Sequence, residues 1–172
     1  REVTRALTLW PEWAYAIVHL GKRVENRGWP PPRDLRRFCV HAGKQIGGSS
    51  SARDVRGSIA EVLQVASDAG CRWEGRTIAQ MDRQRYRHLE EETIEAVCKM
   101  RSSLACVVEL AGVRARRSAG RDGWHMPDSL GWELCEQIIT LPNIPARGAQ
   151  RLWLLSKEER IAVRTALESG AS

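Results

Sequence analysis

The residues best suited to chemistry form a short charged group, Lys22, Glu25 and Arg27, which follows a glycine. On an extended segment, side chains two residues apart point to the same face, so Glu25 and Arg27 share a face and Lys22 lies at the preceding turn. One carboxylate between two cations could bind a base edge through Glu25 and a phosphate or carbonyl through Lys22 or Arg27. Lys22 beside a carboxylate could instead transfer protons, and an ion pair that ties a strand to a helix explains the same spacing.

Tryptophan residues flank this charged group. The chain has seven Trp but only one Phe and two Tyr. An indole combines a large flat face with one N–H donor, so it suits both protein cores and pockets that stack a base. Trp13 falls on the apolar side of an expected helix, which favours core packing. Trp10 and Trp29 stand at strand ends beside prolines, where either could stack a base. All three are candidate binding residues.

A second group follows an expected strand near residue 40. His41 could act as a general acid or base, because the ordinary pKa of histidine is about 6.5. A hydrogen-bonded structural role fits His41 equally well. Lys44 precedes a Gly-Ser-rich loop and could contact a phosphate. No second histidine lies nearby and the five cysteines form no CxxC pair, so we expect neither a metal site nor a cofactor.

Periodicity and turn residues predict the elements that position these groups. Pro11 suits the first turn of a helix, and Pro30 stops the strand before it because proline cannot donate to a ladder. Ser51 and Asp54 have the spacing of a capping box, and so do Ser156 and Glu159. The expected strands are 5–10, 24–29, 37–41, 104–113, 132–140 and 150–155. The expected helices are 11–20, one that ends near 69, 77–100 and one from 156 to about 167. This order predicts a single α+β domain over 1–172 with a mostly antiparallel, closed sheet.

Charge and hydropathy narrow the class of partner. The net charge of +6 and the pI of about 9.4 favour polyanions, above all nucleic acid. The arginines at 114, 116, 117 and 121 could guide a nucleic-acid backbone or form a solvated loop. No run reaches the ~18 apolar residues that a membrane span needs. Wide cysteine spacing favours reduced thiols, so we expect a cytoplasmic protein without a membrane partner.

Three segments, in order, resemble the ASCH family of the PUA-like superfamily. The first resembles the family's strand, its Trp-Ala helix and its Lys-x-x-Glu-x-Arg pattern; it consists of Leu7-Thr8-Leu9, Trp13-Ala14, Ile17, Gly21-Lys22, Glu25 and Arg27. The second, residues 40–44 (Val-His-Ala-Gly-Lys), is similar to a strand end of one subgroup. The third, Ile144-Pro145-Ala146-Arg147-Gly148 with Leu152-Trp153, is similar to that subgroup's closing motif. Residues 51–101 match less well, and we expect a helical insertion there.

The resemblance implies a PUA-like β-barrel with packed helices and a cleft that recognises RNA, a nucleotide or a modified base. Some members are hydrolases: one branch removes an acyl group from modified cytidine, and another cleaves RNA. The amidohydrolase branch has a threonine nucleophile three residues after the lysine, where this chain has Glu25.

Three hypotheses follow for function. The leading one is a binding cleft for a base of single-stranded RNA, with Lys22 and Glu25 on the base, Trp10 or Trp29 stacked on it, and Arg27 and Lys44 nearby. The alternative is a small hydrolase in the same cleft, either a ribonuclease with Lys22 and His41 as acid and base or, less favoured, an amidohydrolase. The third is a protein partner bound by the helix at 77–100.

Overall fold

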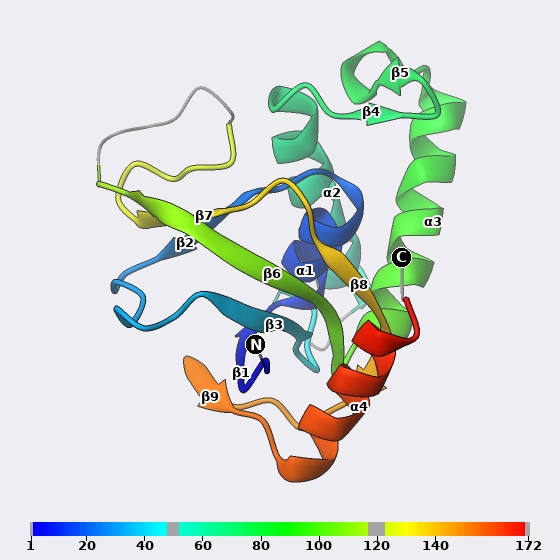
Figure 1. The fold of residues 1–172 in the computed structure, drawn as a ribbon. Helices are drawn as coiled ribbons and strands as arrows, with labels where there is room; N and C mark the ends of the chain where they lie inside the picture. The colour runs from blue at the N-terminus through cyan, green and yellow to red at the C-terminus, as the bar shows by residue number, and fades with distance from the viewer. Residues whose placement is uncertain (1, 48–51, 117–122, 171–172) are drawn as a thin grey trace.

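A curled β-sheet with helices on both faces makes up the fold, in a computed structural model that describes residues 2–47, 52–116 and 123–170 (Figure 1). The helices are α1 (Pro11–His19), α2 (Ala52–Asp68), α3 (Arg83–Met100) and α4 (Lys157–Glu168), with the 3-10 helix η1 (Ile78–Gln80). The strands are β1 (Arg5–Leu9), β2 (Val24–Arg27), β3 (Arg37–Ala42), β4 (Arg72–Trp73), β5 (Arg76–Thr77), β6 (Ser103–Arg114), β7 (Leu130–Leu134), β8 (Ile139–Pro145) and β9 (Leu152–Leu154).

One mixed sheet contains seven of the strands. Its order is β2-β7-β6-β3-β1-β9, with β8 beside β6, and only the β1–β3 pair is parallel among the described strands. β6 pairs with β8 along its first half and with β7 along its second, and register shifts occur near Cys106 and Gly112. Such bulges bend a strand and increase its twist, so the sheet curls. The predicted α+β class with a mostly antiparallel sheet is confirmed, but within the described residues the curled sheet is an open half-barrel that ends at β2 and β9.

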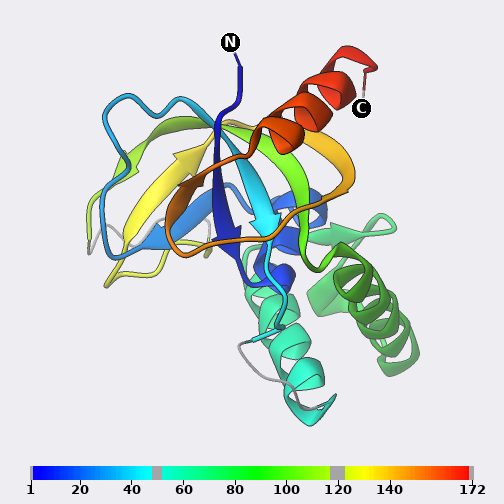
Figure 2. The same ribbon diagram turned by 90° about the horizontal axis from the view of Figure 1, so that it is seen from below.

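Each face of the sheet carries its own hydrophobic core. Successive strand residues point to opposite faces, so neighbours in β1 and β3 divide between the two cores. Leu7 and Val40 belong to the core that α1, α2 and α3 cover. Ala6 and Cys39 belong to a smaller core beneath α4. Figure 2 shows α4 and the α2–α3 pair on opposite sides of the sheet. The capping box predicted for α4 is present, because Ser156 and the side chain of Glu159 satisfy each other's backbone N–H.

The segment between β3 and β6 contains more structure than the sequence indicated. The hairpin β4–β5 connects α2 to η1 and α3 (Figure 1). The expected helix at 77–100 is wrong at its start, because α3 begins at Arg83. Asp82 is its N-cap and accepts a hydrogen bond from the Arg85 N–H at 2.9 Å. The capping spacing at Ser51 lies outside the described residues. That residues 51–101 are an insertion into a single domain stays a prediction.

The expected strand at 132–140 is two strands. β7 ends at Leu134 and β8 begins at Ile139, and the two pair with different halves of β6. Pro142 lies inside β8 rather than interrupting it. A proline is tolerated there because β8 pairs only with β6 among the described strands and has a free edge. No described helix has the length and apolar character needed to span a bilayer.

Candidate functional site

A cleft of about 1370 Å³ opens at one edge of the half-barrel. Its walls come from the end of β1, the first turn of α1, β2, the segment after β3 and the connection from β8 to β9. The sequence predicted candidate residues on three of these segments, namely the first turn of α1, β2 and the segment after β3. It did not predict a role for the fifth, residues 145–151, although the closing motif of the family resemblance lies there.

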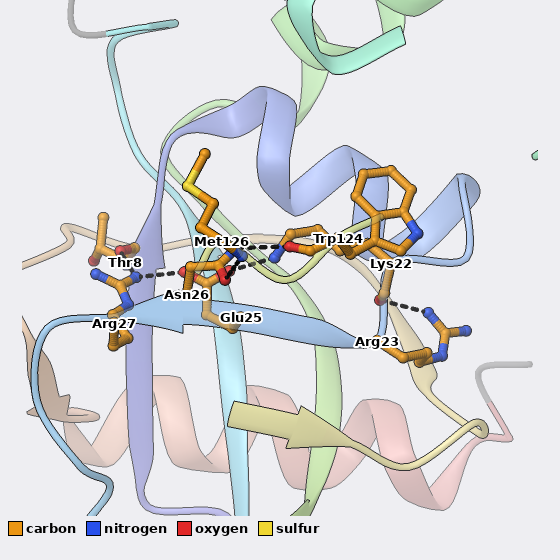
Figure 3. Close-up of polar contacts among 8 residues, drawn as sticks. All are labelled: Thr8, Lys22, Arg23, Glu25, Asn26, Arg27, Trp124 and Met126. Atoms are coloured by element: carbon orange, nitrogen blue, oxygen red, sulfur yellow. Dashed lines mark hydrogen bonds and ion pairs between the residues drawn. The ribbon is translucent and has the colours of Figure 1, made fainter. Parts of the chain in front are cut away.

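A buried ion-pair chain forms the inner part of the site. Lys22 Nζ lies 2.6 Å from Glu25 Oε2, and Arg27 Nη2 lies 3.1 Å from Glu25 Oε1. Arg27 Nη2 also donates to the Thr8 carbonyl at 3.1 Å, which joins β2 to β1 (Figure 3). Glu25 and Arg27 line the cleft, whereas Lys22 is only 2% exposed and lies behind them. Lys22 therefore holds the Glu25 carboxylate in place and is not among the residues that line the cleft.

The Glu25 carboxylate keeps capacity for a ligand. Each oxygen accepts from one cation, and a carboxylate oxygen has two lone-pair directions, so each can accept one further N–H. Between Glu25 and Arg27, the Asn26 amide donates to the Trp124 carbonyl and accepts from the Met126 N–H, both at 2.8 Å (Figure 3). These two hydrogen bonds fasten the segment before β7 to β2 and so fix the strand that carries the site.

His41 is buried beside the cleft with both ring nitrogens engaged. Nε2 lies 3.0 Å from the Ala146 carbonyl, which only accepts, so Nε2 carries a proton. Trp153 Nε1 donates to Thr8 Oγ1 at 3.0 Å, which leaves the Thr8 hydroxyl proton for His41 Nδ1 at 3.2 Å. The resulting chain runs from Trp153 through Thr8 and His41 to Ala146, and a neutral imidazole with its proton on Nε2 completes it. Burial lowers the pKa of His41, in agreement with this state.

This arrangement bears on the predicted acid–base pair. The polar contacts of His41 go to Thr8 and Ala146, and that of Lys22 goes to Glu25. Within the described residues, no hydrogen bond joins His41 to Lys22. The network instead connects β1, β3 and the segment 145–151, which are far apart in the sequence. Gly148 lies so close to the His41 ring that a Cβ there would overlap it.

The mouth of the cleft combines an exposed indole with cations. Trp10 is 53% exposed, and Trp13 on the next part of the helix is half-buried and also lines the cleft. Trp13 therefore faces both the core and the site. Exposed Lys44, Arg147 and Arg151 line the cleft as well. Sequence reasoning found Lys44 but missed the two arginines, for which the motif around Gly148 was the available signal.

Trp29 lies in a different place from the one expected. It does not line the cleft but packs edge-on against Trp132, with ring centroids 4.8 Å apart, while Trp132 Nε1 donates to the Trp29 carbonyl. The Arg151 guanidinium lies over the Trp29 ring, 4.9 Å from the ring centroid. Trp29 borders a second, smaller cavity that shares Arg151 with the cleft.

Glu12 anchors the segment that carries Lys44. This α1 residue is 1% exposed, and its Oε1 accepts from the Gly47 N–H at 2.7 Å. Its Oε2 is buried and has no hydrogen-bond partner among the described residues. Desolvation by burial raises the pKa of Glu12. Sequence reasoning did not identify this buried acid, because Glu12 occupies an ordinary first-turn position of a helix.

The remaining predicted groups lie elsewhere. Arg114 bonds to Glu133 at 2.6 Å, and Arg116 donates to the carbonyls of Gly28 and Asp128. These two arginines therefore have roles within the fold, and residues 117 and 121 lie outside the described residues. Among the described residues, no group of three or more His, Cys, Asp or Glu is arranged to hold a metal ion.

Comparison with known proteins yields structural neighbours only. No family model and no curated protein matches the sequence. The solved structures that are similar include an ASCH protein from Zymomonas mobilis, at 16% identity and a TM-score of 0.48 over 98% of this chain and 95% of that one. A single-residue variant of the Zymomonas protein is similar at 17% identity and a TM-score of 0.48, over the full length of both chains. Both carry the family name that the three sequence segments predicted, and the likeness concerns the fold alone.

Proposed function

We propose that the cleft binds a nucleotide within a single-stranded nucleic acid, with RNA as the favoured polymer. The observation that carries the proposal is the exposed Trp10 ring at the mouth of a cleft that has a fixed carboxylate inside and cations at its rim. An indole offers a stacking face to any base, and arginine and lysine side chains attract the phosphates. The net charge of +6 supports the same class of partner.

The proposed contacts follow from the positions of the groups. A base stacks on Trp10 and donates an amino or imino N–H to the free lone pairs of Glu25. Lys22 and Arg27 each occupy one oxygen of that carboxylate and hold it in place. The phosphates lie against Lys44, Arg147 and Arg151 at the rim. Trp13 adds its half-buried ring to the lining of the cleft.

The hydrolase alternative has less support from this geometry. Lys22 is buried behind Glu25, and the His41 ring already has a partner at each nitrogen. A ribonuclease that used these two groups as acid and base would first have to break the network around His41. We therefore treat cleavage as an outcome that the binding experiment must detect.

The test is a titration of fluorescein-labelled single-stranded RNA by anisotropy at low and moderate salt, with each sample run afterwards on a denaturing gel. We expect binding that weakens as salt rises and leaves the RNA intact. Trp10→Ala should weaken binding about tenfold, within the roughly 1–3 kcal/mol that stacking of one base contributes. Ile161→Ala, at an exposed apolar position of α4, is the matched control and should change nothing.

Three results would go against the proposal. Absence of salt-sensitive binding would refute it. So would binding that Trp10→Ala and Ile161→Ala alter equally, because the cleft would then not be the site. Shortened RNA on the gel would contradict a function limited to binding and would favour the hydrolase alternative.

A further inference from the structure

A second cavity of about 650 Å³ lies beside the cleft. One wall is the triple-proline segment at 30–32, and the other is β9 with Trp153 and Leu154. Gln150 and Arg151 line both this cavity and the cleft, so the two form one continuous surface. The proline rings fix the backbone of their wall, which makes the cavity a preformed one.

The lining of this cavity is cationic. It includes Arg5, Arg33 and Arg151, and no acidic side chain is among the lining residues. Arg5 is paired with Asp34 at 2.9 Å. Arg33 is exposed and forms no ion pair with another described residue. Its guanidinium is therefore available to an anion that enters the cavity.

Arg151 lies between the two cavities and has an unusual backbone conformation. Its φ of 61° places the backbone in the left-handed region, which costs a residue with a side chain about 1 kcal/mol. This backbone conformation accompanies the stacking of the guanidinium on the Trp29 ring. Because Arg151 is itself exposed, the outer face of the guanidinium is open to a second planar group. A base could stack there or take the place of the guanidinium on the indole.

We propose that a single nucleic-acid strand continues from the cleft across Arg151 into this second cavity, which binds at least one further nucleotide. Arg33 and Arg151 contact its phosphate, and its base stacks on the Arg151–Trp29 pair against the proline wall. The charge of the lining favours a polyanion, and the stacked planar groups favour a base over an acidic peptide. This inference rests on the proposed function of the cleft and adds the direction in which the strand leaves it.

The experiment measures affinity as a function of oligonucleotide length. Fluorescein-labelled RNAs of mixed sequence, from one to eight nucleotides long, are titrated with the full chain. We expect affinity to rise about tenfold once the RNA is long enough to reach the second cavity. Arg33→Gln should leave mononucleotide affinity unchanged, weaken the longer RNAs about fivefold and lower the slope of log K against log salt by about one. Arg87→Gln, on the exposed side of α3, removes the same charge and should have no effect.

A second variant keeps the test independent of any single arginine. Leu154 is 73% exposed and lines the second cavity, so Leu154→Glu places a carboxylate beside the expected phosphate without disturbing a core. It should remove most of the gain with length and leave mononucleotide binding intact. Ile161→Glu introduces the same charge on α4 and is the matched control.

The outcomes separate this inference from the proposed function. If mononucleotide binding depends on Trp10 but affinity does not rise with length, the inference is overturned and the function of the cleft stands. The same holds if Arg33→Gln and Leu154→Glu behave like their controls. Polyglutamate that displaces the longer RNAs as well as an unlabelled oligonucleotide of equal charge would also overturn it. Loss of mononucleotide binding altogether would refute both.

Discussion

Two lysine–glutamate pairs of this molecule have the same length and opposite surroundings. Lys22 Nζ lies 2.6 Å from Glu25 Oε2 beside the cleft, and Lys99 Nζ lies 2.6 Å from Glu95 Oε1 on α3. The side chains of the first pair are 2% and 10% exposed, and those of the second pair are 70% and 69% exposed. Distance alone therefore says nothing about what each pair contributes.

The difference shows how the two regions use charge. On α3 water competes for both partners, so the pair between Glu95 and Lys99 contributes little to folding, although the Lys99 hydrogen bond lowers the pKa of Glu95. Beside the cleft both partners have lost water, and each depends on the other. The buried charges of Lys22 and Glu25 depend on each other, whereas the charges of Glu95 and Lys99 are solvated. Matched substitutions in the two regions test this contrast.

The largest effect should come from Lys22→Met. The variant leaves Glu25 with Arg27 as its single cationic partner, so the free energy of unfolding should fall by about 3 kcal/mol, the lower end of the cost of breaking a buried pair. Lys99→Met should leave the unfolding midpoint unchanged. Urea unfolding followed by tryptophan fluorescence measures both. Equal shifts for the two variants would show that burial does not distinguish the pairs.

The second-largest effect should come from Gly148→Ala, because Gly148 lies against the His41 network. In Gly148→Ala a new Cβ lies 2.5 Å from His41 Nδ1 and 2.9 Å from Thr8 Oγ1, so the segment 145–151 must shift. We expect a loss of about 1–3 kcal/mol in unfolding free energy, the usual cost of overpacking, together with weaker RNA binding. Gly28→Ala is the control, because a Cβ at Gly28 meets nothing within 4 Å. An unchanged midpoint for Gly148→Ala would show that the network tolerates a displaced segment.

A glycine in the helical region should give the opposite sign. Gly57 lies within α2, is exposed, and has open space around the position of a Cβ. Gly57→Ala should raise the unfolding free energy by about 0.5–1 kcal/mol, because alanine loses less backbone entropy in a helix. The same urea unfolding series measures it, and RNA affinity should not change. A destabilised Gly57→Ala would mean that α2 packs against something at this position.

The smallest effect should come from Glu12→Gln, as a change in how the free energy of unfolding depends on pH. Burial raises the pKa of Glu12 in the folded chain, so its protonated form is the better tolerated one. The free energy of unfolding that protonated Glu12 contributes is fully present below the pKa of about 4.5 that Glu12 has in the unfolded chain. It is lost as pH rises through the higher pKa of Glu12 in the folded chain. Glu12→Gln keeps an acceptor for the Gly47 N–H and removes the charge, so its gain over wild type should grow as pH rises from 4 to 8.

Unfolding curves at several pH values measure that gain. Glu91→Gln, an exposed residue of α3, is the matched control and should follow wild type at every pH. A Glu12→Gln variant that loses stability with rising pH in parallel with wild type would contradict the assignment, because another group would then cause the loss.

Local patterns predicted most of the elements and, to within a residue or two, most of their boundaries. Pro11, the strand expected at 104–113 and the capping box at Ser156 each depend on near neighbours in sequence, and each prediction holds in the structure. The start of α3 was missed because Asp82 was not recognised as its N-cap. The hairpin β4–β5 was missed as well. In the structure Glu74 and Gly75 form its tight two-residue turn, and both have the positive φ that such a turn requires.

The candidate site was predicted less completely than the fold. The sequence predicted that Glu25 and Arg27 share a face, and both line the cleft. It could not show that Lys22 lies behind them or that Trp29 borders a different cavity. Arg147 and Arg151 were not predicted as site residues, because their segment joins the cleft through contacts distant in sequence, such as those of Ala146 with His41 and Ser102.

The sequence by itself determined which residues alternate, cap and turn, and it therefore determined the α+β class and the spacing within the charged group on β2. Only the tertiary structure decided which charges are buried and which residues distant in sequence line one cleft. The physical reason is the separation along the sequence of the residues that interact. Helices, caps and turns depend on neighbours a few residues away. Burial and convergence depend on contacts such as those from Thr8 to His41 and from His41 to Ala146, which exist only once segments far apart in the sequence have come together.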